Sequence, residues 1–424
     1  MDCFGKIIGY ESIKNELKRT ADVLQNPEVY QKLGVQPPCG LLLHGVPGVG
    51  KTLMAKCLIE ASGRTAFPLR RNQPDGDFVR AINETFSKAA ESEPSIVFLD
   101  DMDKFATVEE DRSNEEEFVA VQACIDNLKG KSVFVLATAN SISVLPDSLL
   151  RPGRFDMVVE ISEPNGEENE KIIEYYLSQK PHVDDVDPKQ IARIMIGRSC
   201  AELETALNSA GLLAGFDRSD KITMRHILMG CISTTHHVTR DFIISNRTDH
   251  PDDVNSTMVR VACHEAGHLV VAEALSPGSV TIACIHNPIN GSRGFVSYHG
   301  EDIDDKFSDC AMRSLGGYIA VQQRFGILDS GACDDLEKAK NILYRAIVRH
   351  GLRGMALLES PFQDSDNLLS SQEGALFAEL ERCCTDVRQI LSKNRAFLDA
   401  TIKALLEKGL LTADDITYLK KQAG

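Results

Sequence analysis

Short, continuous apolar runs alternate with amphipathic stretches along the first 160 residues. The runs lie at residues 41–43, 96–99 and 133–136, and apolar side chains recur at helical spacing between them. Continuous apolar runs are typical of parallel strands whose sheet is covered by helices on both faces, because every strand residue is then buried. The pattern predicts an α/β core with a parallel sheet in residues 1–160.

The pattern then becomes purely helical over residues 161–235, which predicts a small helical lid on that core. Residues 236–256 are rich in Thr, Asn, Asp and His and include His250-Pro251, so we expect a linker there. Residues 257–424 predict a second, mainly helical domain, with extended segments at 280–285 and 294–298 around a turn sequence at 287–291.

Composition excludes several classes of protein. The chain has 46 Lys and Arg against 62 Asp and Glu, a net charge of −16, which argues against nucleic acid as a partner. No apolar run is long enough to insert into a membrane, and no signal peptide precedes Phe4, so we expect a soluble protein. The 12 Cys are scattered without a Cys-x-x-Cys pair, which suits free thiols in the cytoplasm.

A phosphate-binding motif follows the first apolar run. Gly45-Val46-Pro47-Gly48-Val49-Gly50-Lys51-Thr52 fits G-x-x-x-x-G-K-[ST] and precedes a helical stretch that starts at Leu53. In such a loop, backbone N–H groups surround phosphates at a helix N-terminus, the Lys reaches the β and γ phosphates, and the Thr hydroxyl binds Mg²⁺. The motif predicts a nucleoside triphosphate site.

Polar residues follow the next two apolar runs. Because ligands bind at the carboxyl ends of parallel strands, we expect Asp100 to hold Mg²⁺ through water and Asp101 to activate the attacking water. Asn140 would polarise the same water. Arg151 and Arg154 lie in a Pro-Gly turn and suit stabilisation of the γ-phosphate charge in a neighbouring subunit, which implies a ring.

The motifs at 45–52, 98–103, 140 and 149–156 together resemble those of an AAA+ ATPase. Gly197-Arg198-Ser199-Cys200-Ala201-Glu202-Leu203 is similar to the G-x-S-G-A-[DE]-L of the helical lid in that family. The resemblance implies ATP as the nucleotide, with Cys200 and Ala201 near the adenine and Ile8-Gly9 on its other side.

A metal-binding motif opens the second domain. His264-Glu265-Ala266-Gly267-His268 fits H-E-x-x-H, and on a helix the two His share one face and can both bind Zn²⁺. Glu265 is then the general base for the attacking water. No His follows at the G-x-x-H distance, which argues against a metzincin. Spacing leaves the third ligand open among Glu273, His286, His299, Asp334 and Asp335.

The second domain resembles the peptidase domain of FtsH-type AAA+ proteases. The resemblance rests on the H-E-x-x-H motif, Leu315-Gly316-Gly317, Phe325-Gly326 and Gly331-Ala332-Cys333-Asp334-Asp335-Leu336-Glu337, and it continues to residues 404–408. In that family the Asp before the Leu is the third zinc ligand, which implies Asp335. The resemblance also implies a homohexamer whose ATPase ring feeds polypeptide to an enclosed peptidase ring.

Two departures from the FtsH pattern concern the membrane and ATP hydrolysis. FtsH proteases carry N-terminal membrane segments, whereas the ATPase module here begins at Phe4-Gly5, which implies no direct membrane insertion and a possible adaptor of unknown identity. Asp101 stands where Glu is usual, and its carboxylate is roughly 1.5 Å shorter in reach. We expect slow ATP hydrolysis.

Two further departures concern substrate handling. The loop that threads substrate corresponds to residues 72–77 and has no aromatic residue at the expected place. Phe67 and Phe78 flank it, and each either touches substrate or belongs to the core. Asp126-Asn127-Leu128 replaces an Asp-Gly-Phe segment of the family, which predicts altered coupling between subunits.

These observations predict an α/β AAA+ P-loop ATPase core with a helical lid, followed by a mainly α-helical zinc metallopeptidase domain. The predicted function is an ATP-dependent zinc endopeptidase for loosely folded protein substrates, which would bind as an added strand at 280–285 or 294–298. One alternative is a nucleotide-gated protein remodeller or scaffold. Another is an ATP-independent peptidase carried on an impaired AAA+ ring.

Overall fold

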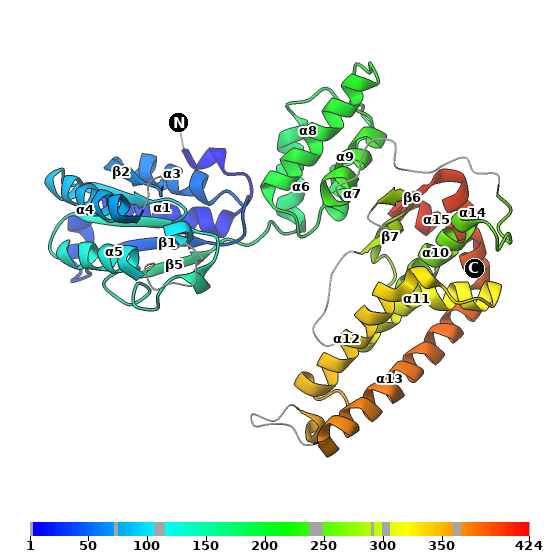
Figure 1. The fold of residues 1–424 in the computed structure, drawn as a ribbon. Helices are drawn as coiled ribbons and strands as arrows, with labels where there is room; N and C mark the ends of the chain where they lie inside the picture. The colour runs from blue at the N-terminus through cyan, green and yellow to red at the C-terminus, as the bar shows by residue number, and fades with distance from the viewer. Residues whose placement is uncertain are drawn as a thin grey trace. The chain divides into compact units, whose positions relative to one another are not determined.

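The computed structural model describes residues 3–71, 75–105, 115–236, 249–289, 292–298, 306–358 and 366–423. The chain divides into two compact units, Met1–Thr234 and Thr235–Gly424 (Figure 1). No helix in the described ranges is long and apolar enough to cross a membrane. The finer division into core, lid, linker and second domain stays a prediction.

A five-stranded parallel sheet with the order β2-β3-β4-β1-β5 forms the centre of the first unit. The three predicted apolar runs are its inner strands: β1 (Gly40–His44), β3 (Ser95–Leu99) and β4 (Val133–Ala139). The edge strands β2 (Thr65–Leu69) and β5 (Met157–Glu160) were not predicted. Both are partly exposed along their length, so they lack the continuous apolar signal of an inner strand.

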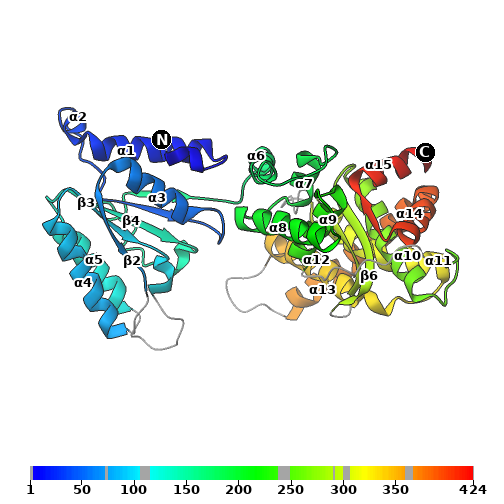
Figure 2. The same ribbon diagram turned by 90° about the horizontal axis from the view of Figure 1, so that it is seen from above.

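Helices cover both faces of this sheet, as the apolar runs require. Leu41 and Leu43 of β1 belong to one buried cluster with α1 (Glu11–Gln25) and α3 (Lys51–Ser62). Leu42 belongs to another, with α4 (Asp75–Glu91) and α5 (Glu115–Asn127), and Figure 2 shows the two helical layers. Alternate residues of one strand therefore supply two cores.

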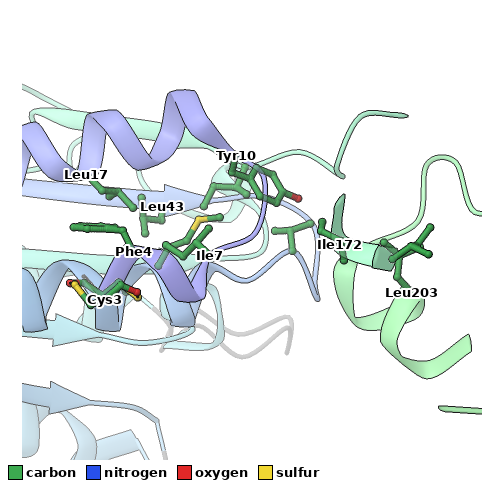
Figure 3. Close-up of a cluster of buried hydrophobic side chains, with 14 of the residues drawn as sticks. Cys3, Phe4, Ile7, Tyr10, Leu17, Leu43, Ile172 and Leu203 are labelled. Carbon is green, nitrogen blue, oxygen red and sulfur yellow. Dashed lines mark hydrogen bonds between the residues drawn. The ribbon is translucent and has the colours of Figure 1, made fainter. Parts of the chain in front are cut away.

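The lid consists of helices, as predicted: α6 (Gly166–Leu177), α7 (Pro188–Ile194), α8 (Cys200–Phe216) and α9 (Met224–His236). Asn165 and Ser199 each form a capping box at a helix start, which satisfies N–H groups of the first turn. Ile172 and Leu203 of the lid lie in the same buried cluster as Phe4 (Figure 3). One buried cluster thus extends from the first residues of the chain into the lid.

The predicted linker is only partly described. Helix α9 runs through His236, so the linker predicted from residue 236 starts one residue inside this helix, and residues 237–248 lie outside the described ranges. Helix α10 (Thr257–Leu275) begins after Ser256, whose hydroxyl accepts a hydrogen bond from Val259 N–H. This helix begins at residue 257, where the second domain was expected, but the compact unit that contains it already starts at Thr235, so the linker boundaries stay a prediction.

Helices dominate the second unit: α10, α11 (Phe307–Phe325), α12 (Cys333–His350), α13 (Asp366–Lys393), α14 (Arg395–Lys408) and α15 (Ala413–Ala423). An antiparallel sheet with the order β7-β6-β8 accompanies them. Strands β6 (Val280–Ile289) and β7 (Ser292–Tyr298) contain the predicted extended segments. The short strand β8 (Leu410–Thr412) was not predicted.

The aromatic residues beside the predicted threading loop belong to the core. Phe78 is fully buried in α4 and meets Phe105 edge-on, with ring centroids 4.8 Å apart. Phe67 lies half-buried in β2 against the same cluster. For Phe78 the alternative of substrate contact is therefore wrong. Of the loop itself, residues 72–74 lie outside the described ranges and Asp75 already begins α4.

Candidate nucleotide and metal sites

Strand β1 leads into the phosphate-binding loop, whose glycines are required by the backbone. Gly45, Gly48 and Gly50 have φ angles of 147°, 86° and 98°, which side-chain-bearing residues rarely adopt. A Cβ on Gly45 would lie 1.9 Å from the Ile161 carbonyl oxygen, and one on Gly48 would lie 2.8 Å from the Ser199 hydroxyl. Gly45 and Gly48 therefore leave room for the chain that follows β5 and for the lid, where a larger residue would clash.

Lys51 is held over the same loop. Its buried Nζ donates hydrogen bonds to the carbonyl oxygens of Gly45 at 2.7 Å and Val46 at 2.8 Å. Burial lowers the pKa of Lys51, while nearby aspartates oppose this. Of the other loop residues, Pro47 is exposed and Val49 is buried, and Leu53 on α3 is exposed.

The structure brings together the two residues predicted to bind Mg²⁺. Asp100 Oδ1 accepts hydrogen bonds from Thr52 Oγ1 at 3.1 Å and from Thr138 Oγ1 at 2.8 Å. Thr138 lies near the end of β4 and was not predicted. Because β3 and β4 are neighbours, its hydroxyl orients the carboxylate from the adjacent strand.

The side chain of Asp101, unlike that of Asp100, is hydrogen-bonded to two cations. Its backbone has a left-handed φ of 56°, and its carboxylate Oδ2 accepts hydrogen bonds from Arg70 Nη2 at 2.6 Å and Lys104 Nζ at 2.9 Å. Burial alone would raise the pKa of Asp101, but these two cations lower it. A carboxylate held by two cations is a weaker base, which agrees in direction with slow hydrolysis.

The other residues predicted to sense the γ-phosphate lie in contrasting environments. Asn140 donates from its backbone N–H and from Nδ2 to the two oxygens of Asp103, at 3.0 and 3.1 Å. Arg154 donates to Asp126 Oδ2 at 2.9 Å within its own unit. Arg151 is exposed, and its side chain makes no hydrogen bond or ion pair with another residue that the structure describes.

The lid reaches the loop where the adenine site was predicted. Ala201 N–H donates to the Gly48 carbonyl oxygen at 3.0 Å, and Cys200 Sγ lies 3.7 Å from the Tyr10 hydroxyl. Tyr10 directly follows Ile8-Gly9 and is buried, although it was not predicted. Tyr10 thus connects Ile8-Gly9 with Cys200, the residues expected on the two sides of the adenine. Its hydroxyl also donates to the Ser162 carbonyl oxygen at 3.0 Å.

In the second unit, three side chains converge on one point. His264 and His268 lie one turn apart on α10, and their Nε2 atoms are 2.9 Å apart. Asp335 Oδ2, from the first turn of α12, lies 3.1 Å from the Nε2 of His264 and 3.3 Å from that of His268. In the described part of the chain, these residues form the one cluster of this kind that could hold a metal ion.

The other candidates for the third ligand serve elsewhere. Glu273 accepts hydrogen bonds from Gly278 N–H and Lys420 Nζ, both at 3.0 Å, so it fixes the chain after α10. His286 is buried beside the Phe295 ring. Asp334 is exposed. His299 lies outside the described ranges.

Hydrogen bonds to the far nitrogens orient both imidazoles. His268 Nδ1 lies 2.7 Å from the Arg313 carbonyl oxygen, and His264 Nδ1 lies 2.6 Å from Asp329 Oδ2. A carbonyl or carboxylate oxygen accepts, so both Nδ1 atoms donate, which leaves the two Nε2 atoms to face Asp335. Two imidazole nitrogens and a carboxylate oxygen that face one another, with outer partners behind them, form a donor set that suits Zn²⁺.

The surroundings add negative potential. Burial alone would lower the pKa of His264, but hydrogen bonds to Asp329 and Asp335 raise it to about 10. Burial would raise the pKa of Asp335, yet the two imidazoles hold it well below its usual range. The group of side chains thus favours positive charge at its centre.

Glycines make room for the site between α10 and α11. A Cβ on Gly267 would lie 2.4 Å from the Gly316 carbonyl oxygen, so these helices cross at backbone contact. A Cβ on Gly317 would lie 2.6 Å from His268 Nε2 and 2.7 Å from ring atoms of His264. Larger residues at these positions would displace the two imidazoles.

Glu265 lies beside these ligands at the wall of a cleft. The cleft has a volume of about 1050 Å³ and is lined by residues of α10, α11, α12 and β7. Glu265 is buried, and a Cβ on Gly294 of β7 would lie 2.4 Å from its Oε1. Burial raises the pKa of Glu265, which suits a carboxylate that takes up a proton.

Comparisons with known proteins find an ATPase family and zinc metalloproteases. Residues 41–163 match the model of the ATPase family associated with various cellular activities (AAA). The chain is 28% identical to ATP-dependent zinc metalloprotease FtsH 3 of Sphaerobacter thermophilus, over 96% of this chain and 85% of that protein. It is 29% identical to ATP-dependent zinc metalloprotease FtsH 2 of Symbiobacterium thermophilum, over 97% and 73% of the two chains.

The chain is an FtsH-type AAA+ protein. It is also 31% identical to the chloroplastic ATP-dependent zinc metalloprotease FTSH 9 of Arabidopsis thaliana, where the match covers 82% of this chain and 46% of that protein. The predicted fold class is confirmed, since a five-stranded parallel sheet with helices precedes a mostly helical second unit.

Several residues of the FtsH-type sites were missed from the sequence. Asp329 and the Arg313 carbonyl, which orient the imidazoles, belong to no motif used for the prediction. Tyr10 and Thr138 in the nucleotide site were also missed. An acidic residue shortly before the Gly331–Asp335 motif is the one available signal for Asp329, and a backbone carbonyl gives none.

Proposed function

We propose that this FtsH-type chain is an ATP-dependent zinc endopeptidase that degrades proteins as a homohexamer. The observation that carries the proposal is the convergence of two Nε2 atoms and one carboxylate oxygen, within 3.3 Å of one another, beside the buried Glu265. The names of the relatives support the same activity.

In this proposal, His264, His268 and Asp335 hold Zn²⁺, which acts as a Lewis acid toward the water and the peptide carbonyl. Glu265 takes a proton from the attacking water as the new C–O bond forms. It returns that proton to the amide nitrogen as the C–N bond breaks, so the two products are a carboxylate and an amine. Gly294 leaves the space in which the Glu265 carboxylate lies.

The ATPase half would supply the force for translocation. Lys51 and the backbone of the loop would bind the phosphates, and Thr52 and Asp100 would hold Mg²⁺. Asp101 would activate the attacking water, at a rate reduced by its bonds to Arg70 and Lys104. The exposed guanidinium of Arg151 suits a role in the neighbouring subunit of the ring.

Substrate would bind along β7. Strand β6 pairs with β7 on one side and β8 on the other, so of the two predicted segments only 294–298 lies in an edge strand. An extended peptide added to β7 would pass Glu265 and the proposed zinc ligands. We propose loosely folded proteins as substrates and, from the 12 free cysteines, a reducing compartment such as the cytoplasm.

Degradation of an unfolded fluorescent casein tests the function. Purified protein is assayed with ATP, with ADP and without nucleotide, and Glu265→Gln is the control that keeps the fold but lacks the base. We expect ATP-dependent cleavage that disappears in this variant. Zinc-loaded protein that cleaves nothing would contradict the proposal and favour a remodeller or scaffold.

A second candidate function is an ATP-independent peptidase on an AAA+ platform. The engagement of Asp101 by two cations favours it. It predicts casein cleavage at the same rate in all three nucleotide conditions, with Lys51→Ala as active as the unmodified protein. A requirement for ATP that Lys51→Ala abolishes would exclude it.

A further inference from the structure

Tyr298 ends strand β7 inside the proposed peptidase cleft. Its side chain lines the cleft together with His264, Glu265 and His268. Gly294, against which the Glu265 carboxylate lies, faces the same side of β7 as Tyr298, because residues of a strand alternate between its two sides. The phenol therefore belongs to the wall that carries the proposed general base.

The hydroxyl of Tyr298 lacks a hydrogen-bond partner. No residue that the structure describes accepts from it or donates to it, although the side chain is partly buried and tyrosine hydroxyls inside a protein usually find a partner. It is not sealed inside the protein either. Among the described residues, the fully buried polar side-chain atoms without a partner belong to Glu117, Asn169, Ser279, Arg324 and Gln372, and the Tyr298 hydroxyl is not one of them. A hydrogen bond from this hydroxyl is thus available to a molecule in the cleft.

Its electrostatic surroundings keep this hydroxyl a donor. Burial, followed by the charge of Glu265, raises the pKa of Tyr298, so the phenol is protonated at neutral pH. The guanidinium of Arg313 lies 5.1 Å from the centre of its ring, where a cation draws electron density from the ring and polarises the O–H bond. The Arg313 carbonyl also accepts from His268 Nδ1, so one residue contacts both the phenol and a metal-facing imidazole.

We propose that Tyr298 is a further catalytic residue, whose hydroxyl donates a hydrogen bond to the peptide carbonyl oxygen as negative charge develops there. Arg313 is a positioning residue that holds the ring. Preorganised donors of this kind stabilise the transition state more than the bound substrate, because the charge on the oxygen grows as water adds. The inference rests on the proposed peptidase function.

The test is Tyr298→Phe, which removes only the hydroxyl, with Tyr344→Phe as the matched control. Tyr344 is partly buried in the same unit but does not line the cleft. A short quenched fluorescent peptide serves as substrate, so that unfolding and translocation do not limit the rate. We expect Tyr298→Phe to lower kcat by about 100-fold with little change in KM, because loss of one such donor costs about 100-fold or more.

Measurements other than turnover accompany the kinetics. A phosphinic peptide that mimics the tetrahedral carbon should bind Tyr298→Phe about 100-fold more weakly. Binding of the uncleaved amide peptide, measured in a Glu265→Gln background, should change little. Zinc content and thermal midpoint should equal those of Tyr344→Phe.

Each other result has a defined meaning. A kcat within twofold of the unmodified protein, with unchanged phosphinate affinity, would overturn the role of Tyr298 and leave the peptidase proposal intact. Loss of zinc or of thermal stability in Tyr298→Phe would overturn it too, in favour of a purely structural role. If the unmodified, zinc-loaded protein cleaves no peptide and Glu265→Gln behaves identically, the proposed function itself fails.

Discussion

Asp329 offers the sharpest test of the metal site, because it touches an imidazole without touching the point where the three proposed ligands meet. Its Oδ2 accepts from His264 Nδ1 at 2.6 Å and its Oδ1 accepts from Gly331 N–H at 3.0 Å. We consider Asp329→Ala, which removes both acceptors, and Asp329→Asn, which offers one carbonyl oxygen to two donors.

The magnitude follows from the geometry. The contact is short and charge-assisted, and only 18% of the Asp329 side chain is exposed, so solvent screens it weakly. Losing an outer partner of a metal-binding His typically costs about 10-fold to 100-fold in metal affinity, or about 1.4 to 2.7 kcal/mol. Asp329→Asn should be at least as damaging as Asp329→Ala, because an amide that donates to Nδ1 places the His264 proton on Nε2.

The assay is competition for zinc between the apoprotein and a fluorescent chelator at neutral pH, with thermal unfolding of the apoprotein to verify the fold. Asp334→Asn is the matched control, since Asp334 lines the same cleft but is exposed. Asp335→Asn should lose more affinity than any of these variants. Zinc affinity of both Asp329 variants within twofold of the unmodified protein would refute the reasoning.

Three other perturbations have defined outcomes. Gly317→Ala places a Cβ 2.6 Å from His268 Nε2 and should abolish tight zinc binding while circular dichroism stays unchanged; normal zinc content would contradict the packing argument. Asp101→Asn should keep ATP affinity but lower hydrolysis by about 100-fold or more, measured as phosphate release, unless Asp101 is not the base. Glu379 is buried with hydrogen bonds from Arg382 and Ser308; burial alone would raise its pKa, but these bonds lower it. The carboxylate therefore stabilises the fold above its ordinary pKa of about 4.3 and stops doing so as the pH falls through the lowered folded value. Glu379→Gln should cost about 1.5 to 3 kcal/mol in urea unfolding at pH 7, and this difference should shrink steadily as the pH falls below the ordinary pKa of about 4.3; a difference independent of pH would exclude this cause.

Elements with strong local signals were predicted from the sequence. Inner strands β1, β3 and β4 are buried on both faces, so their apolar runs are continuous. Edge strands β2 and β5 carry exposed or half-exposed residues, and β8 is three residues long, so their patterns do not differ from those of loops. The burial of Phe78 could not be predicted either, because the sequence around an aromatic residue beside a loop is the same whether the ring faces solvent or the core.

In both sites, too, the local part was predictable from the sequence and the long-range part was not. The sequence by itself determined the local relations: the Gly-rich loop directly ahead of Lys51, and the imidazoles of His264 and His268 four residues apart. The helix repeat places these two imidazoles on one face before any tertiary contact forms. Spacing could not choose Asp335 among five candidates, and only the resemblance to FtsH-type proteases pointed to it.

The tertiary structure alone decided what meets those local motifs. Asp335 lies 71 residues beyond His264. It reaches the site because α11 packs against both α10 and α12, and glycines allow α10 and α11 to meet at backbone contact. Asp329, the Arg313 carbonyl and Tyr298 reach the cleft in the same way. Such long-range placements depend on how the buried faces of helices and strands pack together. A sequence pattern indicates that a face is buried, but it does not indicate which helix or strand covers that face.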